Sequence, residues 1–277
     1  MRRSLKTFFR GNALHIMVVP QQDMGAFRRA FPHETDLAFV AQEELVDSIY
    51  YPDWLYRIAT KFAGSQLWRL ESHAGRPGWI VQQIAKLNCT KLIQDGAIVF
   101  LDSDLFFFRP FDASTLGIEN ARLLLRIEPD AENSKHRHHI AKAREMLALP
   151  PGKTEHHYMG SPAIWYADWL SLLHRHLEKV SGTSWQGALH DAGHLSEYSI
   201  YGVFVDEVLK PSDLAIRDGR YNLMAWDRES FNQLKSELLN PAFETNKEIG
   251  LVIQSNIGIP ATEYEDLLER LLNAKDE

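Results

Sequence analysis

The chain has 277 residues, of which 45% are hydrophobic, and it contains a single cysteine. This length and apolar content suffice for one large packed domain or two smaller ones, and one thiol excludes a disulfide framework within the chain. The net charge of −7 argues against a broad basic surface for nucleic acid. An anionic ligand would therefore have to be held by local cations.

Apolar runs of strand length alternate with longer segments of helical period, which is typical of α/β proteins. We expect strands at 13–19, 36–41, 97–102, 121–127, 161–166 and 250–255, and helices at 78–93, 134–149, 168–180 and 261–276. No internal repeat or long polar linker interrupts this order. The pattern predicts one α/β domain, 1–277, with a mixed, mostly parallel sheet flanked by helices.

The opening segment MRRSLKTFFRGN reads as a helix. It is basic, but it lacks the apolar run of about seven to fifteen residues that a secretory signal peptide needs. No apolar stretch approaches the roughly 20 residues of a membrane span. We therefore expect a cytoplasmic protein without a transmembrane segment, and the lone Cys89 fits a reducing compartment.

Two aspartates, Asp102 and Asp104, interrupt the apolar stretch AIVFLDSDLFFFRPFD. Residues 97–101 favour a buried parallel strand, and open α/β sheets bind ligands at the carboxyl ends of such strands. We expect the chain to turn at Ser103, so that both carboxylates reach one point. Paired carboxylates disfavour each other's ionisation unless a cation lies between them, and their oxygens suit Mg²⁺ or Mn²⁺. The alternative is that Asp102 caps a turn and Asp104 is solvated.

Three sequence blocks, GWIVQQIAKL, FLDSDLFFFRPF and SEYSIYG, carry a family resemblance. The second resembles the DxD signature of GT-A glycosyltransferases. Together, in this order, the three are similar to a largely uncharacterised bacterial GT-A family with W-x-x-QQ-x-x-KL, DSD and S-E-Y-x-x-Y-G blocks, and the similarity covers most of the chain.

The resemblance implies a GT-A-like (Rossmann-like) fold in which Mn²⁺ or Mg²⁺ on the DxD motif holds a nucleotide-sugar donor. It implies a metal-dependent glycosyltransferase of hexosyltransferase type that acts on a carbohydrate or lipid-linked acceptor, in bacterial surface-polysaccharide assembly. The donor-binding part would be about 1–127 and the acceptor-binding part about 128–277. Many GT-A enzymes begin with a strand that touches the nucleotide base, whereas this chain begins with the helix that would follow it.

On the donor side, we expect Asp104 to be the principal metal ligand and Asp102 to contact ribose or metal, with Ser103 in the turn between them. Gln83 and Lys86 are neighbours on the surface of one helix. Lys86 would place a cation beside the diphosphate, and Gln83 would bind ribose or sugar. The alternative is a solvated helix face, where lysine is common.

On the acceptor side, Ser196 is expected to cap a helix with Glu197 in its first turn, a purely structural role. If Glu197 instead faces an acceptor hydroxyl, it would be the general base of an inverting reaction. In a retaining enzyme it would orient the acceptor. Tyr198 and Trp165 are candidate acceptor contacts. For Trp165, as for Trp169, the alternative is a place in the core.

The histidines near 136–139 and 155–157 lack zinc-site spacing and cysteine partners. We expect a helix or loop surface there, with contact to the acceptor as the other reading. Many GT-A enzymes complete the metal shell with a late histidine, but none follows His194 here. Gln254, Ser255 or Asn256, or water, would have to serve.

Two rival functions remain open at this point. Phosphatases of the haloacid dehalogenase type also place DxD after an apolar strand, with Asp as the nucleophile. They usually have Thr or Val where this chain has Phe106, and their motif lies near the start of the chain. The other rival is a nucleotide-sugar-binding module without turnover.

Overall fold

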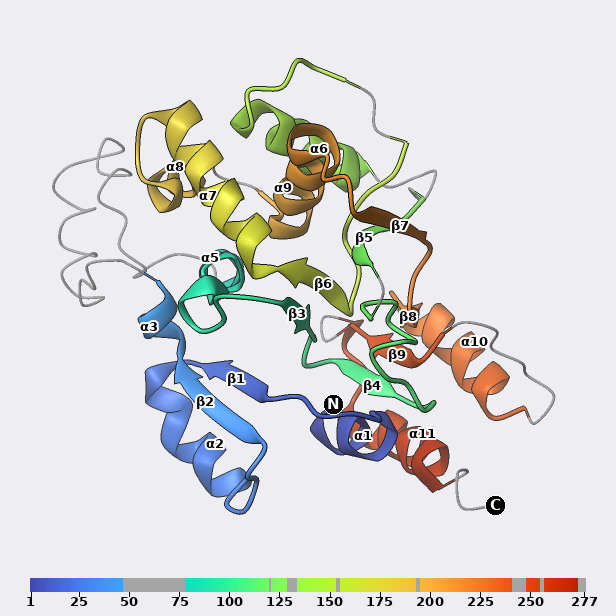
Figure 1. Ribbon diagram of the computed structural model, residues 1–277. Coiled ribbons are helices and arrows are strands. Elements are labelled where there is room, and N and C mark those ends of the chain that lie inside the picture. Colours follow the sequence, from blue (N-terminus) through green and yellow to red (C-terminus); the bar gives the residue numbers. More distant parts are fainter. Residues whose placement is uncertain are drawn as a thin grey trace, which may run out of the picture.

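The computed structural model describes residues 1–46, 78–119, 121–128, 134–152, 155–192, 195–240, 248–254 and 257–273. Within these ranges the chain is a mixed α/β protein, as predicted (Figure 1). The first unit, at the lower left of Figure 1, is a parallel β1–β2 pair with one helix beside it. The elements of the first 46 residues are β1 (His15–Val19), α2 (Met24–Ala30), β2 (Leu37–Ala41), α3 (Gln42–Leu45) and α1 (Arg2–Phe8), which lies beside the C-terminal helix.

The remaining described strands form three further ladders. One is antiparallel, β3–β6; one is parallel, β5–β7; and one has three strands in the order β4–β9–β8, with β4 antiparallel and β8 parallel to β9. Their bounds are β3 (Ala97–Phe100), β4 (Leu105–Phe107), β5 (Arg122–Arg126), β6 (Ala163–Tyr166), β7 (Leu214–Asp218), β8 (Asn222–Ala225) and β9 (Gly250–Ile253). All six strands predicted from the sequence are present, whereas β4, β7 and β8 were not predicted.

The strand before the aspartates differs from the prediction in two ways. β3 pairs antiparallel with β6, and its side chains are half-buried or exposed, so a buried parallel strand was the wrong prediction. An apolar run fixes neither the direction of the partner strand nor how far it is covered. The strand also stops at Phe100, because the Leu105 N–H donates to the Asp102 carbonyl oxygen (3.2 Å) and closes a turn over Ser103 and Asp104. The turn predicted at Ser103 is therefore confirmed.

Helices alternate with strands along the chain, and they lie against the ladders in Figure 1. The four predicted helices all form, although the first ends at Leu87 and is followed by a short 3-10 turn. The bounds are α5 (Gly78–Leu87), α6 (Ser134–Met146), α7 (Ala167–Ser181), α8 (Trp185–Ala192), α9 (Glu197–Val203), α10 (Arg228–Leu238) and α11 (Ala261–Asn273). None of the described helices is long and apolar enough to cross a lipid bilayer.

The β4–β9–β8 ladder separates two apolar clusters. Leu105 and Val252 pack into the main core, which extends along the chain from Phe8 to Leu272. Residues that alternate with them, among them Leu251 and Ala225, pack into a smaller cluster with α10 and α11. Alternation along β8 and β9 therefore assigns one face of these strands to each cluster, whereas all three residues of β4 belong to the main core.

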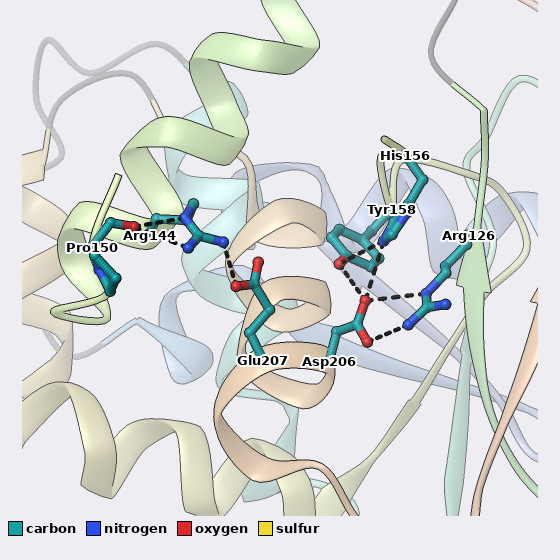
Figure 2. Close-up of polar contacts among 7 residues, drawn as sticks. All are labelled: Arg126, Arg144, Pro150, His156, Tyr158, Asp206 and Glu207. Atoms are coloured by element: carbon teal, nitrogen blue, oxygen red, sulfur yellow. Dashed lines mark hydrogen bonds and ion pairs between the residues drawn. The ribbon is translucent and has the colours of Figure 1, made fainter. Parts of the chain in front are cut away.

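Helix α9 runs directly into a π-helical turn, η4 (Phe204–Leu209), whose acidic side chains anchor it (Figure 2). The Asp206 carboxylate accepts hydrogen bonds from Arg126 of β5, with Nε at 3.1 Å, and from the Tyr158 hydroxyl at 2.7 Å. His156 Nε2 lies 3.2 Å from the same carboxylate. Glu207 pairs with Arg144 of α6. These contacts fix the helix whose other end carries Glu197.

Candidate active site

The Lys86 ammonium group is the centre of a compact polar cluster at the end of β3. Its Nζ lies 3.1 Å from Glu197 Oε1 and 3.3 Å from Asp102 Oδ1, and it donates a hydrogen bond to the Tyr198 hydroxyl at 2.7 Å. Nζ also lies 4.5 Å from the centroid of the Tyr198 ring. The Tyr198 hydroxyl in turn lies 3.5 Å from Asp102 Oδ1. Residues from all three sequence blocks therefore meet at one point.

The cluster is largely withdrawn from water. The Lys86 side chain is 14% exposed and that of Glu197 7%, whereas that of Asp102 is 33% exposed. Burial alone would lower the pKa of Lys86, but the negative charges of Glu197 and Asp102 and the Tyr198 phenol raise it well above its usual range. Lys86 is therefore a permanent cation at neutral pH. Asp102 is the member that faces outward.

Burial has the opposite effect on the two acidic partners from α9. It raises the pKa of Glu197, and the nearby Lys86 charge offsets this only in part. Burial also raises the pKa of Tyr198, so the phenol stays protonated and able to donate a hydrogen bond. The ionised form of Glu197 is therefore stabilised mainly by the neighbouring Lys86 charge.

The SEYSIYG block places its site residues at the start of α9. Ser196 caps α9, as predicted, because its side-chain oxygen accepts from the Ser199 N–H at 3.4 Å. The cap directs Glu197 and Tyr198, in the first turn, toward Lys86 on α5. One turn later, Tyr201 stacks on Trp165 with ring centroids 4.8 Å apart. The block therefore combines a helix cap, two site residues and a core anchor.

The glycine that ends this block allows α9 to approach a tyrosine ring. A Cβ atom on Gly202 would lie 2.0 Å from Cγ of Tyr158, far inside van der Waals contact. Tyr158 is itself held by its hydrogen bond to Asp206 (Figure 2). A side chain at position 202 would therefore displace either the helix or an anchored ring.

The aspartate turn is held on its other side by residues that the sequence analysis did not single out. The Asp102 N–H donates to Ser161 Oγ at 3.4 Å, and Asn222 Nδ2 of β8 donates to the Ser161 carbonyl oxygen. The Asp104 carbonyl oxygen accepts from the Ile253 N–H at 3.2 Å. Ser161 stands in a short SPAIWY segment that reads only as a strand, so no sequence signal points to this contact.

The turn offers the oxygen ligands that a divalent cation needs. The partly exposed Asp102, the half-buried Asp104 and the exposed Ser103 follow one another, and Gln254 comes directly after the residue bonded to Asp104. No group of three or more His, Cys, Asp or Glu side chains with metal-site geometry occurs in the described ranges. Mg²⁺ commonly uses only one or two protein carboxylates and completes its shell with substrate phosphates and water. The residues therefore fit such an ion, and the metal site stays a prediction.

Other predicted site residues have mixed positions. Gln83 lies on α5 and is half-buried. Ser255 and Asn256, proposed as metal ligands, lie outside the described residues, as does His194. Trp165 is 3% exposed and packs against Phe100, with centroids 4.6 Å apart. It occupies the core, so the prediction of an acceptor-stacking face on Trp165 was wrong.

The histidine prediction also needs correction. His136 and His157 are buried, and their ring centroids are 3.9 Å apart. His157 Nδ1 accepts from the Met159 N–H at 3.1 Å. These two side chains are part of the interior rather than of a helix or loop surface, so they are not placed to meet an acceptor.

A hollow of about 450 Å³ lies elsewhere on the β4–β9–β8 ladder. Its lining includes Arg109, Arg217, Asp218 and Glu248. Arg109 follows β4 whereas Asp104 precedes it, so the hollow is at the opposite end of the strand from the aspartate turn. The two features are separate parts of the molecule.

Residues 1–275 match a family of unknown function, DUF6492. The chain belongs to this family. The DUF6492 match covers nearly the whole sequence. No curated protein matches the sequence. Among solved structures, the DUF6492 chain is similar to mouse xyloside xylosyltransferase 1 in its apo form, with a TM-score of 0.46 and 13% identity over 94% of this chain and 92% of that one. A likeness this distant transfers neither an activity nor a site residue.

Proposed function

We propose that this DUF6492 protein is a metal-dependent glycosyltransferase of GT-A type. It would transfer a hexosyl group from a nucleotide-diphosphate donor to a hydroxyl of a carbohydrate or lipid-linked acceptor, in the cytoplasm and in bacterial surface-polysaccharide assembly. The observation that carries the proposal is the meeting of the QQxxKL, DSD and SEYxxYG blocks at one point, through Lys86, Asp102 and Glu197.

The charge distribution of the cluster supports donor binding. A protein of net charge −7 needs local positive charge to hold a diphosphate. Lys86 is a permanent cation beside the outward-facing Asp102, but Glu197 and Asp102 already balance its charge, so the metal ion would have to supply the rest. Asp102 and Asp104 would hold Mn²⁺ or Mg²⁺, with Ser103 and Gln83 beside the donor. The bound ion would supply neutralisation of the departing diphosphate.

The contacts of Glu197 support a role that was not expected from the sequence. A general base needs hydrogen-bond reach to the proton it takes, whereas the Glu197 side chain is 7% exposed and lies 3.1 Å from Lys86 Nζ. This geometry supports Glu197 as the counter-ion that positions Lys86. Its role as base stays a prediction, with Tyr198 beside it as the proposed acceptor contact.

A donor-turnover assay tests the proposal. Purified protein is incubated with Mn²⁺ and a panel of nucleotide sugars, and release of nucleoside diphosphate is measured with and without sugar acceptors. We expect release by the wild type that Asp104→Ala abolishes. Nucleotide binding without release across the panel would favour a non-catalytic module. Release of phosphate from phosphomonoesters, with covalent trapping of Asp102, would favour a phosphatase.

The same assay separates the two roles of Glu197. A general base accounts for a factor of roughly 100 to 10,000 in rate, so Glu197→Gln would reduce turnover by that factor and leave donor affinity unchanged. If Glu197 is instead the counter-ion that positions Lys86, Glu197→Gln would change donor affinity as well. Full activity and affinity in Glu197→Gln would remove both roles.

A further inference from the structure

Trp226 lies at the same end of the β4–β9–β8 ladder as the aspartate turn. The Asp104 carbonyl oxygen, just before β4, accepts from the Ile253 N–H at 3.2 Å. The Ala225 carbonyl oxygen, at the end of β8, accepts from the Gln254 N–H at 3.3 Å. Asp104, Gln254 and Trp226 therefore follow one another across three neighbouring strand ends. With strands about 4.8 Å apart, the backbones of Asp104 and Trp226 are separated by about 10 Å.

The even-numbered residues of β8 lie on the face of the ladder that is linked to Asp102, and Trp226 follows one position beyond the end of this strand. On β8, Asn222 contacts Ser161, whose hydroxyl holds the Asp102 N–H. Met224 packs against the main core from the same face, whereas Ala225 belongs to the opposite cluster. Trp226 continues the even-numbered series.

The Trp226 ring is presented to solvent on a fixed backbone. Trp226 is 48% exposed. Its N–H donates to Ser230 Oγ at 3.0 Å, and Asp227 and Ser230 form the capping box that starts α10. No aromatic or cationic side chain stacks on this ring within the part of the chain that the structure describes.

Single exposed apolar residues are common on protein surfaces and need no function. Phe27 of α2, 37% exposed, is an example beside the β1–β2 pair. Trp226 differs because its flat ring stands on a rigid helix start at the edge that holds the aspartate turn. An indole face stacks on other rings, and stacking of this kind on a nucleobase changes affinity by roughly 5- to 100-fold.

We propose that Trp226 is a stacking platform for a ring of the substrate bound at the Asp102–Asp104 turn. The inference rests on the proposed function and adds to it a residue that recognises the ligand by its ring, beyond the diphosphate. The ring is either the nucleobase or a pyranose of the same substrate, because a planar base and the apolar C–H face of a pyranose can both pack on the indole. The platform does not enter the chemical step.

Isothermal titration in the presence of Mn²⁺ tests this with three probes: pyrophosphate, which has no ring; a set of nucleoside diphosphates; and the corresponding nucleotide sugars. We expect Trp226→Ala to bind pyrophosphate as the wild type does. A base on the platform predicts weaker binding of the diphosphates and of the nucleotide sugars, by about 5- to 100-fold. A sugar on the platform predicts weaker binding of the nucleotide sugars alone.

Controls separate stacking from damage to α10. Trp226→Phe keeps a ring and should restore most of the affinity, whereas Trp226→Leu keeps apolar bulk without a ring and should not. Phe27→Ala removes an exposed aromatic residue elsewhere and should change nothing. Equal loss with all three probes, or unchanged affinity in Trp226→Ala and Trp226→Leu, would overturn the stacking inference alone. A wild type that binds none of the probes would overturn the proposed function and this inference together.

Discussion

Replacing Lys86 with methionine tests whether a buried cation holds the candidate site together. Methionine keeps an unbranched apolar stem and removes the charge that lies 3.1 Å from Glu197 Oε1. At an effective dielectric constant of about 20, unit charges at that separation attract by about 5 kcal/mol before desolvation is subtracted. Removing one partner of a buried pair typically costs about 3 to 5 kcal/mol, because the other charge is left buried. We expect Lys86→Met to lower the free energy of unfolding by about 3 kcal/mol.

A double-mutant cycle with Glu197→Gln isolates the pair. Urea unfolding at pH 7 gives the free energies of the wild type, the two single variants and Lys86→Met/Glu197→Gln. We expect the double variant to be more stable than the sum of the single losses predicts, by about 2 kcal/mol, because the glutamine leaves no unpaired charge. Additivity within about 0.5 kcal/mol would show that the two side chains do not interact, and would refute the reasoning.

The pH dependence supplies a second readout. Burial already raises the pKa of Glu197 above its ordinary value of 4.5, and Lys86 is the main influence that lowers it. Without Lys86 the native state holds the Glu197 proton more tightly still. The loss in free energy of unfolding of Lys86→Met relative to the wild type is therefore smallest below pH 4.5 and grows as the pH rises. Lys142→Met is the control, because Lys142 forms a 2.9 Å pair with the exposed Glu145. It should cost less than about 0.5 kcal/mol at every pH.

Two further changes test the helix that carries Glu197. Burial alone would raise the pKa of Asp206, but hydrogen bonds from His156, Arg126 and Tyr158 hold it well below its usual range (Figure 2). Asp206→Asn should therefore cost about 2 kcal/mol at pH 7, and the difference from wild type should shrink as the pH falls below 3.8, measured by urea unfolding. The exposed Asp213→Asn should be neutral, and equal effects would contradict the account. Gly202→Ala should cost about 2 kcal/mol or more in thermal unfolding, because its Cβ would meet the Tyr158 ring, whereas Gly25→Ala in α2 has room and should be neutral or mildly stabilising. A neutral Gly202→Ala would show that the close approach is not required.

Much of the fold followed from local patterns. Apolar runs located the strands that pair as β1–β2, because a run of five strand-forming residues needs no distant information to be recognised. The turn predicted at Ser103 and the cap predicted at Ser196 both form, and the cap followed from the chemistry of the serine hydroxyl. The strands β7 and β8 were missed because their apolar runs are only three residues long, LAI before Arg217 and LMA after Asn222.

The contacts within the candidate site could not be predicted from the sequence. The helix period placed Lys86 on a polar face, but its contact with Tyr198, 112 positions away, depends on tertiary packing. The same packing buries Trp165 between rings from β3 and α9, which its residue type could not reveal. Ser161 and Trp226 matter because two ladders, β3–β6 and β4–β9–β8, bring them beside the aspartate turn, and neither stands in a recognisable motif.

Metal-dependent nucleotide binding by Asp104→Ala is the measurement that tests the central claim most directly. Asp112→Ala is a matched control, because Asp112 only caps a nearby turn by accepting from the Thr115 N–H at 2.7 Å. Isothermal titration with a nucleoside diphosphate, with and without Mn²⁺, should show Mn²⁺-dependent affinity in the wild type and in Asp112→Ala. Asp104→Ala and Asp104→Asn, folded as judged by thermal unfolding, should lose at least about tenfold of that affinity. Wild-type affinity in both Asp104 variants would contradict a metal and diphosphate site at the aspartate turn.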